Sequence, residues 1–245
     1  MTFEEYIQIL YTDSDDSQKN RDYCENLRDL EYAAADYDFT YKFDQETINE
    51  LKNNSRLPIL SDGDTFTRSV ALMDWVTEHT QYCGYSNLGP SKLDTILDFG
   101  LDRGFEGAIN CANKAILLSD LLLVNDIFAM PVWIENKIYD CNKQTLGCGT
   151  CHVVVHVFIP EYEKWVLLDP SFNTYFTDKA GKVLNLFEVS ALRDTPQNIT
   201  VCNYNLNGTE KFADRYLDDF LFKSLYVISV FGGLKELFSL NGGVA

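Results

Sequence analysis

Three side chains of this sequence have the types and the order needed for nucleophilic catalysis: Cys111, His152 and Asp169. Cys111 stands at the start of an apolar stretch typical of a buried helix. There the helix dipole and the free N–H groups of the first turn favour thiolate over thiol. A base within reach, and a third group that orients the base, complete a catalytic set of this kind. We expect His152 to be the base and Asp169 to orient it.

The stretch that begins at Cys111 predicts the element that positions the thiol. Residues 111–124 are apolar at all but four positions, which indicates a helix that is mostly buried. The four polar positions are Asn113, Lys114, Ser119 and Asp120. Asn110 is a suitable N-cap, because its side-chain oxygen can accept from the first turn. Residues 127–134 then predict a strand interrupted by Pro131.

Residues 152–169 predict a β-hairpin that carries the histidine and the aspartate. The first strand alternates, so one face holds Val153, Val155, Val157 and Ile159, which we expect to be core, and the other holds His152, Val154, His156 and Phe158. A turn at 160–163 leads to a second strand that ends at Asp169. If Ile159 pairs with Lys164, Val154 lies opposite Asp169, and His152 is its diagonal neighbour on the same face.

With these residues identified, the sequence resembles the transglutaminase-like superfamily, whose members carry a helix-start Cys, a strand His and a strand-end Asp in this order. Residues 111–122 are similar to its nucleophile helix, 127–132 to the following strand, and 152–158 and 165–170 to its His and Asp-Pro strands. The resemblance covers about residues 65–176. It is weaker at 216–230, which resemble a terminal helix and strand.

The resemblance implies an α+β, papain-like fold in which the nucleophile helix packs against an antiparallel sheet. It makes His152 the catalytic histidine and places His156 where an acidic residue is common. Three features differ from the animal crosslinking enzymes: Asn110 stands where a glycine-rich lead-in is frequent, Ala112 replaces an aromatic residue, and no calcium-site cluster is apparent. These differences argue against crosslinking activity.

The expected activity is therefore hydrolysis of an amide or peptide bond through a thioester on Cys111, with a peptide or protein substrate. Two alternatives stay open. A transamidase differs only in that an amine, instead of water, attacks the thioester, and a catalytically silent binding module would use the cleft without the chemistry. We expect the backbone N–H of Cys111, rather than Trp75 or His79 on a helix predicted at 65–82, to stabilise the oxyanion.

Composition sets the wider expectations. A chain of 245 residues with a hydrophobic fraction of 46% predicts one main globular domain. We divide it into an N-terminal helical layer at 1–60 and a catalytic core at 61–245. The net charge of −17 argues against a nucleic-acid partner. The first residues lack the pattern of an export signal, and the apolar tail at 220–238 is interrupted by charges, so we expect a cytoplasmic protein without a membrane partner.

A second motif overlaps the catalytic histidine. The string from Cys148 to His152 matches the CxxCH pattern of haem attachment, which belongs to exported proteins. Zinc bound by Cys141, Cys148 and Cys151 with His152 or His156 would consume the catalytic imidazole. A redox pair at Cys148 and Cys151 lacks the usual strand-to-helix setting. We expect no metal and no cofactor, and reduced thiols throughout, because seven cysteines is an odd number.

Overall fold

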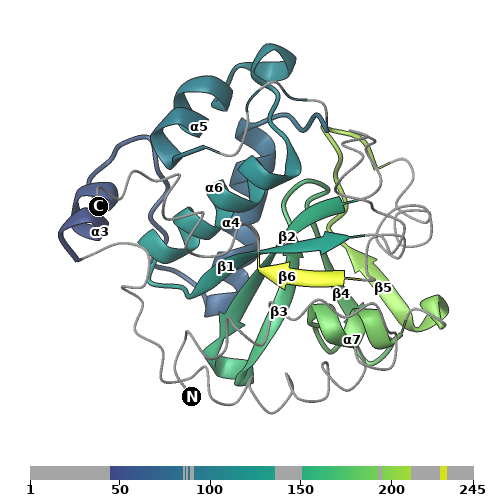
Figure 1. The fold of residues 1–245 in the computed structure, drawn as a ribbon. Coiled ribbons are helices and arrows are strands. Elements are labelled where there is room, and N and C mark those ends of the chain that lie inside the picture. Colours follow the sequence, from purple (N-terminus) through teal and green to yellow (C-terminus); the bar gives the residue numbers. More distant parts are fainter. Residues whose placement is uncertain are drawn as a thin grey trace.

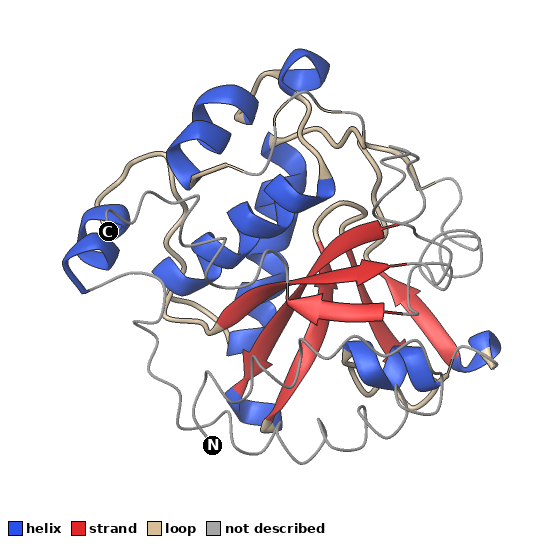
Figure 2. Cartoon of the chain, in the orientation of Figure 1, coloured by secondary structure: helices blue, strands red, loops and turns tan. Residues whose placement is uncertain are grey.

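The computed structural model describes residues 45–84, 86, 88, 91–135, 151–192, 195–210 and 227–230. Within these residues the chain has an α+β fold, in which a layer of helices covers one face of an antiparallel sheet (Figures 1 and 2). Of the expected N-terminal helical layer at 1–60, residues 1–44 lie outside the described residues. The part from residue 45 onward begins with the helix α3 (Gln45–Lys52).

The helical layer is built around α6 (Cys111–Val124), which contacts both the sheet and the other helices of the layer. The other described α-helices are α4 (Thr65–His79) and α5 (Leu93–Gly100), which contact α6, and α7 (Leu186–Ala191). Short 3-10 helices are η3 (Gly104–Gly107), η5 (Pro160–Tyr162) and η6 (Pro196–Asn198). The helix predicted at 65–82 ends three residues early. Thr80 takes an extended conformation there, and its hydroxyl donates a hydrogen bond to the Val76 carbonyl.

The sheet has six strands in the order β5-β4-β3-β2-β1-β6, all antiparallel. The strands are β1 (Ala129–Glu135), β2 (Cys151–Ile159), β3 (Lys164–Asp169), β4 (Thr174–Asp178), β5 (Ile199–Cys202) and β6 (Val227–Val230). β6 is the strand expected near the C-terminus, whereas the helix expected before it lies outside the described residues. Pro131 does not interrupt β1. Among the described residues, β6 pairs with Val132–Glu135 and not with the proline, so the missing N–H of Pro131 removes no bond of that pairing.

The β2–β3 hairpin has the predicted register, with Ile159 paired with Lys164 and Val155 paired with Leu168. η5 and Glu163 form the turn, and Glu163 takes the left-handed conformation (φ 51°) that closes it. The valine face of β2 is core, as expected, and α6 packs on it. The other face is buried as well, because Trp165 packs on both His156 and Phe158.

α6 is more completely buried than its sequence suggested. The four polar positions along it are as inaccessible as the apolar ones: Asn113 and Lys114 are 0% exposed, and Ser119 and Asp120 are 1% exposed. A helix covered on all sides has no solvent face for its polar residues, so each must be satisfied inside the protein. Two of the four, Asn113 and Lys114, belong to the turn that carries the thiol.

Asn125 fastens the polar stretch at residues 53–64 to the end of α6. Its side chain accepts from the Leu60 N–H (2.8 Å) and donates to the Pro58 carbonyl (3.0 Å). Lys52 and Asp126 form an ion pair (2.6 Å) beside it. The stretch is thereby bound to the helical layer.

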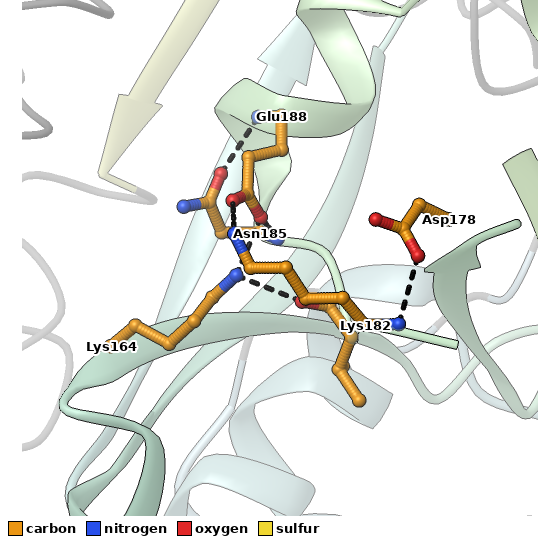
Figure 3. Close-up of polar contacts among 6 residues, drawn as sticks. Lys164, Asp178, Lys182, Asn185 and Glu188 are labelled. Atoms are coloured by element: carbon orange, nitrogen blue, oxygen red, sulfur yellow. Dashed lines mark hydrogen bonds and ion pairs between the residues drawn. The ribbon is translucent and has the colours of Figure 1, made fainter. Parts of the chain in front are cut away.

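α7 is attached to the outer part of the sheet through Glu188 (Figure 3). Its carboxylate accepts from Lys164 of β3 (2.6 Å) and from Lys182 (2.9 Å), and Glu188 forms a reciprocal cap with Asn185. Asp178 orders the turn before it by accepting from the Lys182 N–H (2.9 Å). These contacts fix the end of the hairpin far from His152.

Among the described residues, no helix is both long enough and apolar enough to span a membrane.

Candidate active site

Cys111 occupies the first turn of α6, with its side chain partly buried against the core. Asn110 is the N-cap, as predicted: its side-chain oxygen accepts from the Asn113 N–H (3.0 Å). The Asn110 carbonyl accepts from the Lys114 N–H (3.0 Å). Helix geometry leaves the N–H groups of Cys111 and Ala112 without an acceptor inside the helix. The positive end of the helix dipole therefore lies beside the sulfur.

The two asparagines also hold the segment before α5 against the helix start. Asn110 and Asn113 both donate to the Leu88 carbonyl (3.0 and 3.1 Å), and the Asn113 oxygen accepts from the Ser91 N–H (3.1 Å). Asn113 is fully buried and its amide is used on both sides. The sequence identified Asn110 as a cap but did not identify Asn113 as a link to residues 88–91.

The chain enters α6 through a tightly packed lead-in. Tyr82 and Ile109 form a parallel β-bridge, and the backbone N–H of Cys83 donates a hydrogen bond to the Ile109 carbonyl (2.9 Å). Gly107, just upstream, has no room for a side chain: a Cβ there would lie 2.4 Å from the Phe99 carbonyl oxygen and 2.6 Å from Arg103 Cβ. The position of Cys111 is therefore set by backbone contacts with the ends of α4 and α5.

His152 and Asp169 meet at the open end of the hairpin. His152 Nε2 lies 2.7 Å from Asp169 Oδ2, and both side chains are fully buried. The second carboxylate oxygen accepts from the Ser171 N–H (2.9 Å), which fixes the rotation of the carboxyl group. The predicted diagonal relation across β2 and β3 is thus realised as a direct contact.

His152 is also coupled electrostatically to the thiol. Burial alone would lower the pKa of His152, but Asp169 and a side-chain hydrogen bond with Cys111 raise it well above its ordinary value. Because Nε2 is engaged by Asp169, Nδ1 is the ring nitrogen that can exchange a proton with the thiol. The structure therefore brings Cys111, His152 and Asp169 together in the order thiol, imidazole, carboxylate.

An aromatic wall lines the imidazole. The Phe172 ring meets His152 edge to face at 5.7 Å between centroids, and it also packs on Tyr82 (5.6 Å) and Tyr204 (6.1 Å). Burial raises the pKa of Tyr204, and Asp169 raises it further, which places this phenol in the field of the carboxylate. Sequence reasoning missed these rings, because three aromatics far apart in the chain carry no local signal.

Lys114 is a further charged group beside the site. Its ammonium donates to the Thr80 carbonyl (3.1 Å) at the end of α4. Burial lowers the pKa of Lys114 to about 7, although the Asp169 carboxylate opposes this shift. A lysine inside an otherwise apolar helix was visible in the sequence, but its closeness to Asp169 was not.

His156 is separate from this group. It lies four residues further along β2, where its ring is stacked on Trp165 with 6.0 Å between the ring centroids. Burial lowers its pKa to about 3, so the ring is neutral at physiological pH. Its placement is that of a core residue.

The remaining predicted residues do not join the site. Trp75 and His79 pack on each other (4.7 Å between centroids), and His79 Nδ1 is bonded to Asp102 (2.8 Å). Cys141 and Cys148 lie outside the described residues, and of Cys151 only the backbone in β2 is described. Within the described part of the chain, no group of three or more potential metal ligands is found.

Comparison with known proteins gives no relative for this arrangement: no family, no curated protein and no solved structure matches the chain.

Proposed function

We propose that this protein is a cysteine-dependent enzyme that transfers the acyl group of an amide or peptide to Cys111 and releases it by hydrolysis. The observation that carries the proposal is the buried pair of His152 and Asp169, with 2.7 Å between the ring and the carboxylate, together with the helix-start thiol of Cys111, which acts on the pKa of the same imidazole. A core histidine needs no acidic partner on one side and a helix-start thiol on the other.

The papain-like fold is part of the same proposal. It is supported by a nucleophile at the start of a buried helix, packed on an antiparallel sheet whose adjacent strands supply the histidine and the aspartate. Because one fold hosts many activities, the proposed function depends on the site and not on the fold.

The first half-reaction forms the thioester. The imidazolium of His152 and the dipole of α6 stabilise the Cys111 thiolate, which attacks the carbonyl carbon of the substrate. The backbone N–H of Cys111 is positioned to donate to the oxyanion of the tetrahedral intermediate. As the C–N bond breaks, His152 Nδ1 donates its proton to the leaving amine, and the acyl group remains on the sulfur.

The second half-reaction releases the acyl group. Neutral His152 takes a proton from water, which attacks the thioester carbon. The C–S bond then breaks, and thiolate, imidazolium and a carboxylic acid are left. Asp169 keeps the Nε2 proton in place throughout, so Nδ1 alternates between base and acid.

Thiol reactivity tests the first requirement. Labelling with iodoacetamide between about pH 5 and pH 9, read for each cysteine by mass spectrometry, should show Cys111 reacting fastest at roughly pH 6. Cys83 and Cys202 are also free and partly exposed, so they are internal controls. In His152→Ala the low-pH reaction of Cys111 should disappear while the controls stay unchanged. A Cys111 that is inert throughout this range contradicts the proposal.

Acyl transfer needs a second measurement. Incubation with p-nitrophenyl acetate should give a burst of nitrophenol and an acetyl group on Cys111 by intact mass, both absent in Cys111→Ser. Added glycinamide then competes with water for the thioester. Acetate as the main product supports hydrolysis, acetyl-glycinamide supports transamidation, and the lack of any acyl-enzyme points to a binding module.

A further inference from the structure

Lys114 is a charged residue beside the triad that the proposed reaction does not yet use. It lies three residues after Cys111 on α6, less than one helical turn away, and its side chain is 0% exposed. A charged lysine buried in this way is costly unless an anion or a set of dipoles compensates it.

The surroundings of Lys114 supply this compensation from two elements. The end of α4 offers the Thr80 carbonyl at 3.1 Å, at the negative end of that helix dipole. The end of β3 offers Asp169, whose charge acts on Lys114. The other ionisable groups near this carboxylate are His152 on β2 and the Tyr204 phenol.

The core residues that α5 contributes to the cluster around α6 are apolar, namely Leu93, Ile96 and Leu97. On the α4 side, His79 precedes Thr80 and is paired with Asp102 at 2.8 Å. Lys114 thus lies less than one helical turn from Cys111 and within electrostatic reach of Asp169.

The charges of the triad and Lys114 can be counted. In the reactive form the thiolate and Asp169 carry one negative charge each and the imidazolium carries one positive charge. Without Lys114 the buried group would hold an excess negative charge, which opposes formation of the thiolate. With the Lys114 ammonium the group is neutral.

We propose that Lys114 is a fourth ionisable member of the site, a positioning residue whose ammonium balances Asp169 and thereby favours the Cys111 thiolate. This rests on the proposed cysteine chemistry and adds to it a dependence on a residue that does not touch the substrate. Its effect is electrostatic, because the ammonium acts on the thiol through the shared carboxylate and across one helical turn.

The effect of Lys114 on the labelling rate of Cys111 should change with pH. Below neutral pH Lys114 is charged, so its removal should disfavour the thiolate and slow Cys111 labelling on the acid side by roughly tenfold. Well above neutral pH Lys114 is already uncharged in the wild-type protein. Its removal should then leave the labelling rate unchanged.

The test compares Lys114→Met with Lys164→Met by iodoacetamide labelling across the same pH range. Lys164 forms an ion pair with Glu188 at the other end of β3, ~17 Å along the strand from Asp169. The expected result is a slower Cys111 reaction for Lys114→Met at about pH 5–6, equal rates at about pH 8.5, and wild-type behaviour for Lys164→Met. An unchanged acid limb, or a rate reduced equally at every pH, overturns the proposal.

The thermal stability of a Lys114 variant distinguishes an electrostatic role of this residue from a structural one. Because the pKa of Lys114 is lower in the folded protein than in the unfolded chain, the unfolded state binds more protons between about pH 7 and pH 10.5, and stability rises with pH across this window. The charged ammonium therefore lowers the free energy of unfolding at lower pH. Lys114→Met should have an equal or higher Tm at about pH 6. A variant that does not fold overturns the proposal.

A measurement on the wild-type protein gives the same answer by reciprocity. If the ammonium favours the thiolate, the thiolate must favour the ammonium equally. Blocking Cys111 with iodoacetamide should lower the pKa of Lys114, followed by NMR of its side-chain nitrogen, by about one unit, which corresponds to the same tenfold effect. An unchanged pKa contradicts the coupling. A wild-type Cys111 that shows no His152-dependent labelling instead refutes the proposed function, and this inference with it.

Discussion

Asp169 interacts with several ionisable groups of the site. One carboxylate oxygen is hydrogen-bonded to His152 and the other accepts from the Ser171 N–H, so both oxygens have partners although the carboxylate is fully buried. The same carboxylate acts on Lys114 and on Tyr204. Charge-assisted hydrogen bonds of this kind are short and strong when both partners are buried. The protonation state of His152 therefore depends on Asp169 more than on any other described group.

Asp169→Asn tests this dependence. The amide can keep a hydrogen bond, but it removes the negative charge that raises the pKa of His152, and its NH2 group favours the wrong tautomer. We expect acyl-enzyme formation to fall by roughly 10²–10⁴-fold and the pH above which activity is lost to move downward. Both follow from acylation rates measured against pH.

Asp178→Asn is the matched control for that change. Asp178 accepts backbone N–H groups in an exposed turn before α7, remote from the triad. Its replacement should leave the acylation profile as in the wild type. Equal losses in the two variants would mean that Asp169 acts only through the stability of the fold.

At the level of elements, the thiol is positioned by the segment that leads into α6. The bridge between Tyr82 and Ile109 ties this segment to the end of α4, and the contact between Gly107 and Phe99 ties it to the end of α5. Helix starts without such contacts fray, because their first N–H groups lack partners. The geometry of the site thus depends on a glycine outside the triad.

Gly107→Ala should disturb both stability and reactivity. The new methyl group would meet the Phe99 carbonyl oxygen at 2.4 Å, an overlap that backbone must move to relieve. We expect a loss of roughly 1–3 kcal/mol in the free energy of unfolding, with slower labelling of Cys111 as the lead-in shifts. Urea denaturation and iodoacetamide labelling measure the two effects.

Gly104→Ala, in the same 3-10 helix, separates crowding from backbone strain. Gly104 has a φ of 57° and open space around its Cβ position. Alanine there should lose only about 1 kcal/mol and leave Cys111 labelling unaltered. If the two variants behave alike, close packing at Gly107 does not position the thiol.

Across the whole molecule, the sheet buries two histidines, His152 in the proposed triad and His156 in the core. His156 is enclosed by Trp165 on the face of β2 that α6 does not cover. Burial lowers its pKa from 6.5 to about 3 in the folded protein. The unfolded chain therefore binds more protons between these values, and stability is lost as the pH falls through this window.

His156→Phe should flatten this acid dependence. The free energy of unfolding, measured in urea at about pH 7 and about pH 4.5, should fall less in the variant, by roughly 2 kcal/mol. Phenylalanine keeps an aromatic ring against Trp165, so packing is retained at pH 7. An identical fall in both proteins would show that His156 is not the group whose protonation destabilises the fold.

The sequence by itself determined the elements that bear the chemistry. Asn110 and the apolar run after it specified the start of α6, since capping and burial are local properties. The alternation of β2 and the turn at 160–163 specified the hairpin register, which placed His152 and Asp169 on one face. These features depend on residues close together in the chain, and a pattern of period 2 or 3.6 is enough to reveal them.

Only the tertiary structure decided what surrounds the triad. Whether the second face of β2 is solvent or core depended on Trp165 and Phe128, and the aromatic wall on His152 depended on rings from three separate segments. Lys114 was one of four polar positions in an apolar helix, and only the fold placed its ammonium on the Thr80 carbonyl and in the field of Asp169. Burial and electrostatic coupling arise from contacts between distant segments, so no local pattern encodes them.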